Sequence, residues 1–275
     1  MRKQFVIMLI LVGALLGAAP MALTADSILL ATTTSTDDTG LLDYVAPLIL
    51  NDTGVEMRWT STGTGKALEL GKNCDADLVL VHAPKAEQTF VEQGFGVNRR
   101  QVMFNDFVLI GPANDPAGIK GMGTAAALAK LAEKQATFVS RGDKSGTHMK
   151  ELSLWKETSL PEPDKQAWYV AAGQGMLRTM AIAEEKKGYT LTDRGTFFKY
   201  ESDHKGNPPL VVLVEGDAKL RNQYSVIELP GARCPKVKAA AAKKVADWWV
   251  SKAGQAAIAG FKLHGKQLFI ANADK

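Results

Sequence analysis

Residues 140–147 read SRGDKSGT, and the organisation of the chain follows from this stretch. It comes after an apolar segment, Ala136–Val139, that we expect to be a strand. It precedes a segment from about His148 to Glu157 that we expect to be a helix. Backbone N–H groups at a helix N-terminus, hydroxyl groups and an Arg guanidinium are suited to bind an anion. We therefore predict a strand–loop–helix unit whose loop binds an anion, and we call Ser140–Thr147 the anion loop.

Two further polar loops follow predicted strands near the start of the chain. Thr33–Thr39 follows a strand at Ser27–Thr32, and Ser61–Gly65 follows a strand at Val55–Thr60. Another strand, Asp77–Val81, is an uninterrupted apolar run of the kind found in parallel sheets. Repeated strand–loop–helix units predict an α/β fold with mainly parallel sheets flanked by helices.

The helix after the first polar loop has an apolar face at Leu41, Leu42 and Val45. We expect Asp37 or Asp38 to cap its N-terminus, because short polar side chains can accept the free N–H groups there.

The length of the chain favours two lobes. A long extended segment at Val102–Ile110, and apolar segments at Leu210–Val214 and Tyr224–Leu229, indicate two crossings between the lobes. We expect the ligand in the cleft between them, because parallel sheets bind ligands beyond the C-terminal ends of their strands. The predicted division is residues 26–105 plus 222–275 for lobe one and residues 106–221 for lobe two.

The end of the chain, from Pro235 to Ala259, has the pattern of one long helix. The adjacent Trp248 and Trp249 are expected to pack in the core.

Residues 1–25 have the composition of a cleavable secretory signal peptide. Arg2 and Lys3 precede the apolar run Phe5–Leu16, which is followed by small residues. Cleavage after Ala25 or the residue before it fits this pattern. The alternative is an uncleaved membrane anchor, since a span needs about 20 apolar residues. We expect the mature protein to be soluble and exported.

Charge and cysteine content bear on whether the chain binds nucleic acid, forms a disulfide or holds a metal ion. The net charge of the whole chain is +4, and losing the two basic residues of the leader leaves about +2. This small charge predicts no nucleic-acid partner. Cys74 and Cys234 are the only cysteines, and in an oxidising compartment we expect them to form a disulfide. The four histidines lack ligand spacing, so neither a cation site nor a cofactor is expected.

Enzyme motifs are incomplete. Ser153-Leu-Trp-Lys156 matches the S-x-x-K of serine acylases, but neither S-D-N nor K-T-G follows. Gly63-Thr-Gly65-Lys66 lacks the first glycine of a P-loop and the hydroxyl residue after its lysine. A secreted hydrolase using Ser145 or Ser153 is the alternative from another class. We expect no enzyme, because no motif places a base beside either serine.

Read together, these segments resemble the solute-binding proteins of ABC importers for oxyanions. The anion loop is similar to the R-x-D-x-S-G-T loop of phosphate-binding proteins. A closer resemblance, to the tungstate-binding family, extends over nearly the whole mature chain. It rests on ATTTSTDDTGLL, STGTGKAL, DLVLVHAP, SRGDKSGTH, GYTLTDRGTF and the segment Trp249–Ile258.

The resemblance implies a two-lobed periplasmic-binding-protein fold of type II that closes on its anion. It also implies a monomer that captures tungstate or molybdate and docks on a membrane permease with an ATPase behind it. Another oxyanion, sulfate or phosphate, is the alternative ligand.

Matched motif by motif, the resemblance implies one set of ligand contacts drawn from three loops. Asp143 is expected to orient the arginine of this set, because its carboxylate would repel a dianion. The implied contacts are Thr32, Thr33, Ser61, Thr62, Arg141, Ser145, Gly146 through its N–H, and Thr147.

One departure from the phosphate-binding pattern concerns His82. Those relatives carry an acidic residue in a stretch like S-D-A-P, where it accepts the proton of hydrogen phosphate. Here the stretch is Val81-His82-Ala83-Pro84. Because an imidazole can donate and a carboxylate cannot, we expect a preference for anions without a proton, namely tungstate, molybdate or sulfate. The choice of tungstate over molybdate rests on the resemblance alone.

Overall fold

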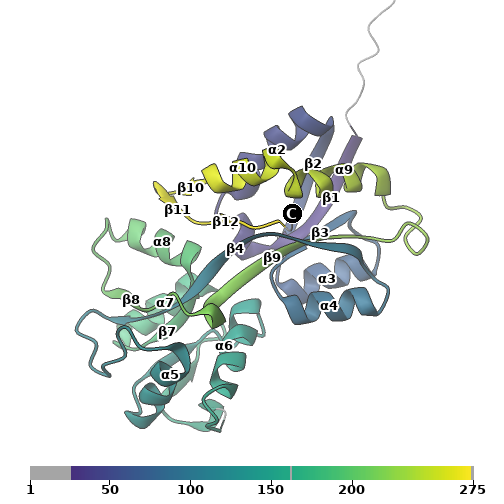
Figure 1. The fold of residues 1–275 in the computed structure, drawn as a ribbon. Helices are drawn as coiled ribbons and strands as arrows, with labels where there is room; N and C mark the ends of the chain where they lie inside the picture. Colours follow the sequence, from purple (N-terminus) through teal and green to yellow (C-terminus); the bar gives the residue numbers. More distant parts are fainter. Residues whose placement is uncertain (1–25, 162, 274–275) are drawn as a thin grey trace, which may run out of the picture.

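The structure is a computed structural model that describes residues 26–161 and 163–273. The predicted signal peptide and its cleavage site lie outside these residues. Figure 1 shows two groups of helices and strands joined by a pair of long strands, β4 and β9. Within the described part of the chain, no helix has the length and apolar character needed to cross a membrane.

Lobe one is built on three strands that lie parallel to one another. The polar C-terminal ends of β1 and β2 are adjacent, because the register pairs Thr32 with Ser61 and Thr33 with Thr62. In Figure 1, α3 and α4 cover one face of this sheet, and α2 and the C-terminal helices cover the other. The elements are β1 (Asp26–Thr33), α1 (Thr34–Asp37), α2 (Leu41–Thr53), β2 (Val55–Thr62), α3 (Thr64–Lys72), β3 (Leu78–Val81) and α4 (Pro84–Glu92).

The first polar loop differs from the prediction, because part of it forms the short helix α1. Neither aspartate caps α2. Gly40, with a φ of 74°, makes the turn into that helix. Asp37 instead accepts hydrogen bonds from Trp59 Nε1 at 2.8 Å and from Ser61 Oγ at 2.6 Å. A carboxylate that two side chains of β2 engage is not available as a cap.

The lobes are connected by the strands β4 (Val97–Pro112) and β9 (Arg221–Glu228), which are antiparallel. β4 pairs with β9 as far as Asp106, and from Phe107 onward it pairs with strands of lobe two. β9 also runs antiparallel to β3, so the sheet is mixed. Its parallel part is β1, β2 and β3, and the strands of lobe two that pair with β4 run antiparallel to it, unlike the mainly parallel sheets predicted for both lobes. This change of partner lies next to the predicted boundary between the lobes.

Lobe two surrounds the second half of β4. An aromatic cluster fills its core, where Phe138, Trp155 and Tyr189 are almost fully buried. Its elements are α5 (Thr124–Glu133), β5 (Phe138–Ser140), α6 (Gly146–Lys156), η1 (Pro163–Lys165), β6 (Tyr169–Ala171), α7 (Met176–Glu185), β7 (Thr190–Asp193), α8 (Arg194–Asp203), β8 (Leu210–Val214) and η2 (Ala218–Leu220).

The chain then returns to lobe one, and the single long helix predicted there is wrong. It is divided into α9 (Ala239–Val250) and α10 (Lys252–Gly260) at Ser251, whose Oγ accepts a hydrogen bond from Gly254 N at 3.1 Å. A Cβ on Gly254 would overlap the carbonyl oxygen of Trp248, so this tight corner requires glycine. Trp248 and Trp249 are buried, as predicted. The final short strands are β10 (Lys262–Leu263), β11 (Lys266–Gln267) and β12 (Ile270–Ala271).

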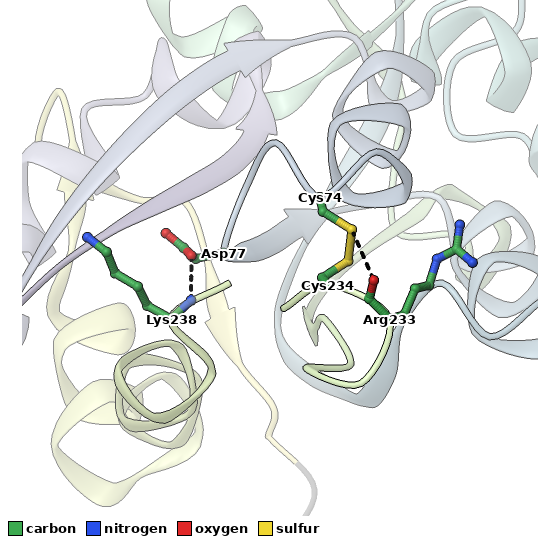
Figure 2. The surroundings of a disulfide bond; sticks show 5 residues. All are labelled: Cys74, Asp77, Arg233, Cys234 and Lys238. Atoms are coloured by element: carbon green, nitrogen blue, oxygen red, sulfur yellow. Dashed lines mark hydrogen bonds between the residues drawn. A yellow bond between two sulfur atoms is a disulfide. The ribbon is translucent and has the colours of Figure 1, made fainter. Parts of the chain in front are cut away.

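The predicted disulfide is confirmed. Figure 2 shows Cys74, just after α3, bonded to Cys234 in the loop that precedes α9. Beside it, Asp77 Oδ1 accepts a hydrogen bond from Lys238 N at 2.8 Å. The disulfide and this hydrogen bond attach the segment before α9 to the region that follows the C-terminus of α3. The N-terminus of α3 lies at the cleft.

Candidate functional site

The anion loop forms the N-terminus of α6. Ser145 is the N-cap, and its Oγ accepts a hydrogen bond from His148 N at 3.3 Å. Arg141 Nε donates to Asp143 Oδ2 at 2.9 Å, and Asp143 Oδ1 accepts from Ser145 N at 3.0 Å. Asp143 therefore orients Arg141 and also holds the loop, as expected. Hydrogen bonds to Ser145 and the charge of Arg141 outweigh burial and lower the pKa of Asp143.

The buried side chain of Glu151 holds the start of the anion loop through hydrogen bonds. Glu151 is 2% exposed and accepts hydrogen bonds from Ser140 Oγ at 2.6 Å, Tyr169 OH at 2.6 Å and Trp155 Nε1 at 3.2 Å. Burial raises the pKa of Glu151 to about 7, although all three donors act in the opposite direction. Because Ser140 Oγ also accepts from Gly142 N, this group fixes the start of the anion loop.

The two lobes meet where α6 faces α3. A Cβ added to Gly146 would lie 3.4 Å from Thr64 Oγ1 and 3.5 Å from His82 Cε1. The Thr64 hydroxyl is buried and has no hydrogen-bond partner in the structure. A buried polar atom without a partner is unfavourable and rare in folded proteins. We interpret it as a donor that a ligand between the lobes would satisfy.

His82 lies beside this junction, on the loop after β3. Its Nδ1 is 2.8 Å from Asn222 Oδ1, its Nε2 is 3.2 Å from Ser35 Oγ, and its ring stacks on Tyr224 with 4.7 Å between centroids. Burial is the main cause of the lowered pKa of His82. Arg141 lowers it further, while Asn222 and Asp193 act in the opposite direction.

The sequence left two interpretations of His82, a donor toward the anion or a residue beside the cleft with satisfied hydrogen bonds, and the second describes the ring, because both of its nitrogens have protein partners. Asn222 Nδ2 donates to Asn105 Oδ1 and to Tyr224 OH, and with the amide in this orientation we assign the proton of the His82–Asn222 hydrogen bond to His82 Nδ1. In the neutral ring Nε2 is then an acceptor, and it accepts a hydrogen bond from the Ser35 hydroxyl group. The neutral His82 ring therefore presents a hydrogen-bond acceptor, Nε2, toward Ser35 and the cleft.

The predicted threonines and serines of lobe one are brought together, but several of their hydroxyl protons are already engaged. Thr32 Oγ1 donates to Leu80 O at 2.8 Å, and Ser61 Oγ donates to Asp37. Thr33 Oγ1 lies 2.7 Å from Thr36 Oγ1 and 3.2 Å from Ser35 Oγ. Thr62 ends β2 beside Thr33, and Thr147 is buried in the first turn of α6. Only the fold reveals which hydroxyl groups remain free to donate.

Sequence reasoning missed one wall of the cleft. A cavity of about 330 Å³ separates Ser35 and Asp38 of lobe one from the N-terminal turns of α7 and α8 in lobe two. The carboxylate Asp193 caps α8 by accepting from Thr196 N at 2.9 Å. Burial, followed by the charges of Asp37 and Asp193, raises the pKa of Asp38, while Arg141 opposes this. The strand–helix boundary within GYTLTDRGTF was the available signal for this wall.

The two serines considered as nucleophiles have other partners. Ser145 Oγ caps α6, and Ser153 Oγ donates to Lys150 O at 2.7 Å. The nearby His148 accepts a hydrogen bond from Lys144 N at its Nδ1. No cluster of side chains that could hold a metal ion occurs among residues 26–161 and 163–273.

Comparison with known proteins gives consistent results. Residues 18–253 match the PBP superfamily domain. The chain is 47% identical over 239 residues to the tungstate-binding protein TupA of Campylobacter jejuni, covering 87% of this chain and 88% of that protein. The solved structure of TupA from Desulfovibrio alaskensis is 60% identical, with a TM-score of 0.86, over 91% of this chain and 100% of that one. A solved tungstate ABC transporter structure from Geobacter sulfurreducens is 45% identical, with a TM-score of 0.76, over 86% and 98% of the two chains.

Proposed function

The chain belongs to the tungstate-binding family of the PBP superfamily, and from this premise we propose that it captures tungstate, and also molybdate, and delivers the anion to an ABC import permease. The predicted family and two-lobed α/β fold class are confirmed. We place the protein in the periplasm, exported by a cleavable signal peptide, and acting as a monomer without catalytic activity.

One observation carries this proposal most directly: the unpartnered Thr64 hydroxyl at the junction between the lobes. It faces the N-terminus of α6, where backbone N–H groups and Arg141 concentrate positive potential. An oxyanion placed there would accept hydrogen bonds from both lobes at once. Binding would therefore favour the closed arrangement, which is the form that a permease can recognise.

The proposed contacts are those predicted from the sequence, with two adjustments. Thr64 is added because its hydroxyl is free. Thr32 and Ser61 would act through the main chain, because their hydroxyl protons are engaged. Thr33, Thr62, Arg141, Ser145, Gly146 and Thr147 complete the proposed set.

A competitive titration on ligand-free protein tests the function. We expect tungstate and molybdate to bind with high affinity by calorimetry and to raise the melting temperature at micromolar concentration. Sulfate and phosphate should compete weakly. Tighter binding of phosphate than of tungstate would contradict the proposal and would favour the alternative of a binding protein for another oxyanion.

A further inference from the structure

Four buried or half-buried polar side chains form a continuous hydrogen-bonded path, which we call the relay: Ser35, His82, Asn222 and Asn105. Ser35 Oγ to His82 Nε2 is 3.2 Å, His82 Nδ1 to Asn222 Oδ1 is 2.8 Å, and Asn222 Nδ2 to Asn105 Oδ1 is 2.8 Å. The three inner members are at most 8% exposed. Buried networks of this kind hold their members in fixed orientations.

The relay connects the ligand cleft to the strands between the lobes. Ser35 lines the cavity between the lobes, and Asn105 and Asn222 lie opposite each other on β4 and β9. His82 also faces Gly146 of lobe two. The relay therefore includes the point where the lobes meet and both strands that join them.

We assign the direction of the hydrogen bonds along the relay from the orientation of the Asn222 amide. Both Nδ2 protons of Asn222 are donated, to Asn105 and to Tyr224. In this orientation its Oδ1 accepts a hydrogen bond from His82 Nδ1–H, and Nε2 of the neutral ring accepts one from the Ser35 hydroxyl. With that proton engaged, Ser35 Oγ can only accept further hydrogen bonds, either from the Thr33 hydroxyl at 3.2 Å or from a group in the cleft.

We propose that His82 is a positioning residue that determines whether the Ser35 hydroxyl accepts from, or donates to, an oxyanion in the cleft. This rests on the proposed function and adds Ser35, which lines the cavity between the lobes, to the proposed ligand contacts. When His82 binds a second proton at Nε2, it donates to Ser35 Oγ, and the Ser35 proton turns toward the anion. The site gains one donor and one positive charge, so anion binding and proton uptake favour each other.

The surroundings of His82 give the sign of the pH dependence. The aromatic ring of Tyr224 on β9 covers one face, and the nearby charged groups are Asp193 at the end of β7 and Arg141 in the anion loop. Burial lowers the pKa of His82, so the ligand-free ring is neutral near pH 7. An incoming dianion raises this pKa. Affinity should therefore increase as the pH falls, by at most about tenfold per pH unit for one proton.

Calorimetry of tungstate binding in two buffers with different ionisation enthalpies counts the protons taken up. Between about pH 7.5 and about pH 5.5, we expect wild-type protein to take up a proton and to bind at least about fivefold more tightly. H82Q, which keeps an amide near Ser35 but cannot titrate, should bind without proton uptake. H264Q, at an exposed histidine, is the matched control and should behave as wild type. Equal proton uptake by wild type and H82Q, or none in wild type, would overturn the proposal.

A second measurement needs no variant. Nitrogen-15 NMR of the His82 ring in ligand-free wild-type protein should show a proton on Nδ1 and none on Nε2. Tungstate at the acid end of the range should protonate both nitrogens. A ligand-free ring protonated on Nε2 would refute the assigned direction. Failure of either test leaves tungstate binding at a single pH intact, whereas failure of the proposed function would abolish that binding itself.

Discussion

At the scale of single residues, the site is defined by which polar groups are free and which are engaged. Asp143 accepts a hydrogen bond from Arg141, and Asp37 accepts one from the Ser61 hydroxyl. The Thr64 hydroxyl has no hydrogen-bond partner among the described residues. These differences separate residues that contact a ligand from residues that hold the contacts in place. They lead to two predictions.

Arg141→Ala should weaken tungstate binding at least tenfold, since a charge-assisted hydrogen bond contributes about 1.5–3 kcal/mol. Arg141→Lys should also weaken it, because an ammonium group lacks the planar fork of guanidinium. Calorimetry measures both effects. Arg58→Ala, on the exposed surface of β2, is the control and should bind normally. Unchanged affinity in Arg141→Ala would show that the anion loop does not contact the ligand.

Thr64→Val should lower tungstate affinity about tenfold without lowering the stability of the ligand-free protein. The buried hydroxyl has no partner, so replacing it with a methyl group should stabilise the ligand-free fold by about 1 kcal/mol. Thr64→Ser retains the hydroxyl and should bind nearly as well as wild type. Denaturant unfolding and calorimetry on the same samples measure the two effects. Loss of stability together with full affinity would assign Thr64 a purely structural role.

At the scale of elements, each polar loop is presented by a strand and a helix that are anchored away from the cleft. The disulfide anchors the far end of α3, and the Glu151 hydrogen bonds connect β5, α6 and β6 beneath the anion loop. The break between α9 and α10 shows the limit of patterns in sequence. The helical pattern of apolar residues runs on past Ser251, yet the helix ends there. The close contact of Gly254 with Trp248 turns the chain back onto the core.

Glu151→Gln should remove a component of the pH dependence of stability. The pKa of Glu151 is raised from 4.5 to about 7, so the folded protein keeps a proton that the unfolded chain loses. Its contribution is complete below pH 4.5 and is lost as the pH rises through about 7. The difference between wild type and variant should change by about 3 kcal/mol across this window. Urea unfolding at a series of pH values measures it.

The control is Glu133→Gln, at a carboxylate on α5 that is 62% exposed. Its stability should follow that of wild type at each pH. A pH profile of Glu151→Gln parallel to that of wild type would mean that Glu151 does not titrate in this range.

At the scale of the whole molecule, the two lobes share one sheet through β4 and β9. The change of partner at Asp106–Phe107 makes this pair of strands the natural position for a hinge. The relay reaches both strands at this position. Bending there would separate α6 from α3 and open the junction that contains Thr64.

Replacing both cysteines by serine should destabilise lobe one while leaving tungstate affinity nearly unchanged. The disulfide joins residues that are 160 positions apart, and the chain-entropy estimate for such a loop is about 5 kcal/mol. The bond lies at the end of α3 away from the cleft, so the site should persist in the folded fraction. Thermal unfolding and calorimetry below the transition measure the two effects, with reduced wild type as the control. A large loss of affinity at full folding would instead connect the disulfide to the site.

The sequence by itself determined the α/β class, the strand–loop–helix units around the cleft, the disulfide and the family. The class, the units and the family depend on local patterns of apolar and polar residues and on motifs that lie within about ten residues, and the disulfide follows from the presence of two cysteines in an exported chain. The tertiary structure alone decided the antiparallel strands between the lobes, the corner at Gly254 and the partners of the two His82 ring nitrogens. It also decided that the Thr64 hydroxyl beside α6 has no hydrogen-bond partner among the described residues. His82 and Asn222 are 140 positions apart. The direction of a hydrogen bond depends on partners brought together from such distances, and no local pattern records it.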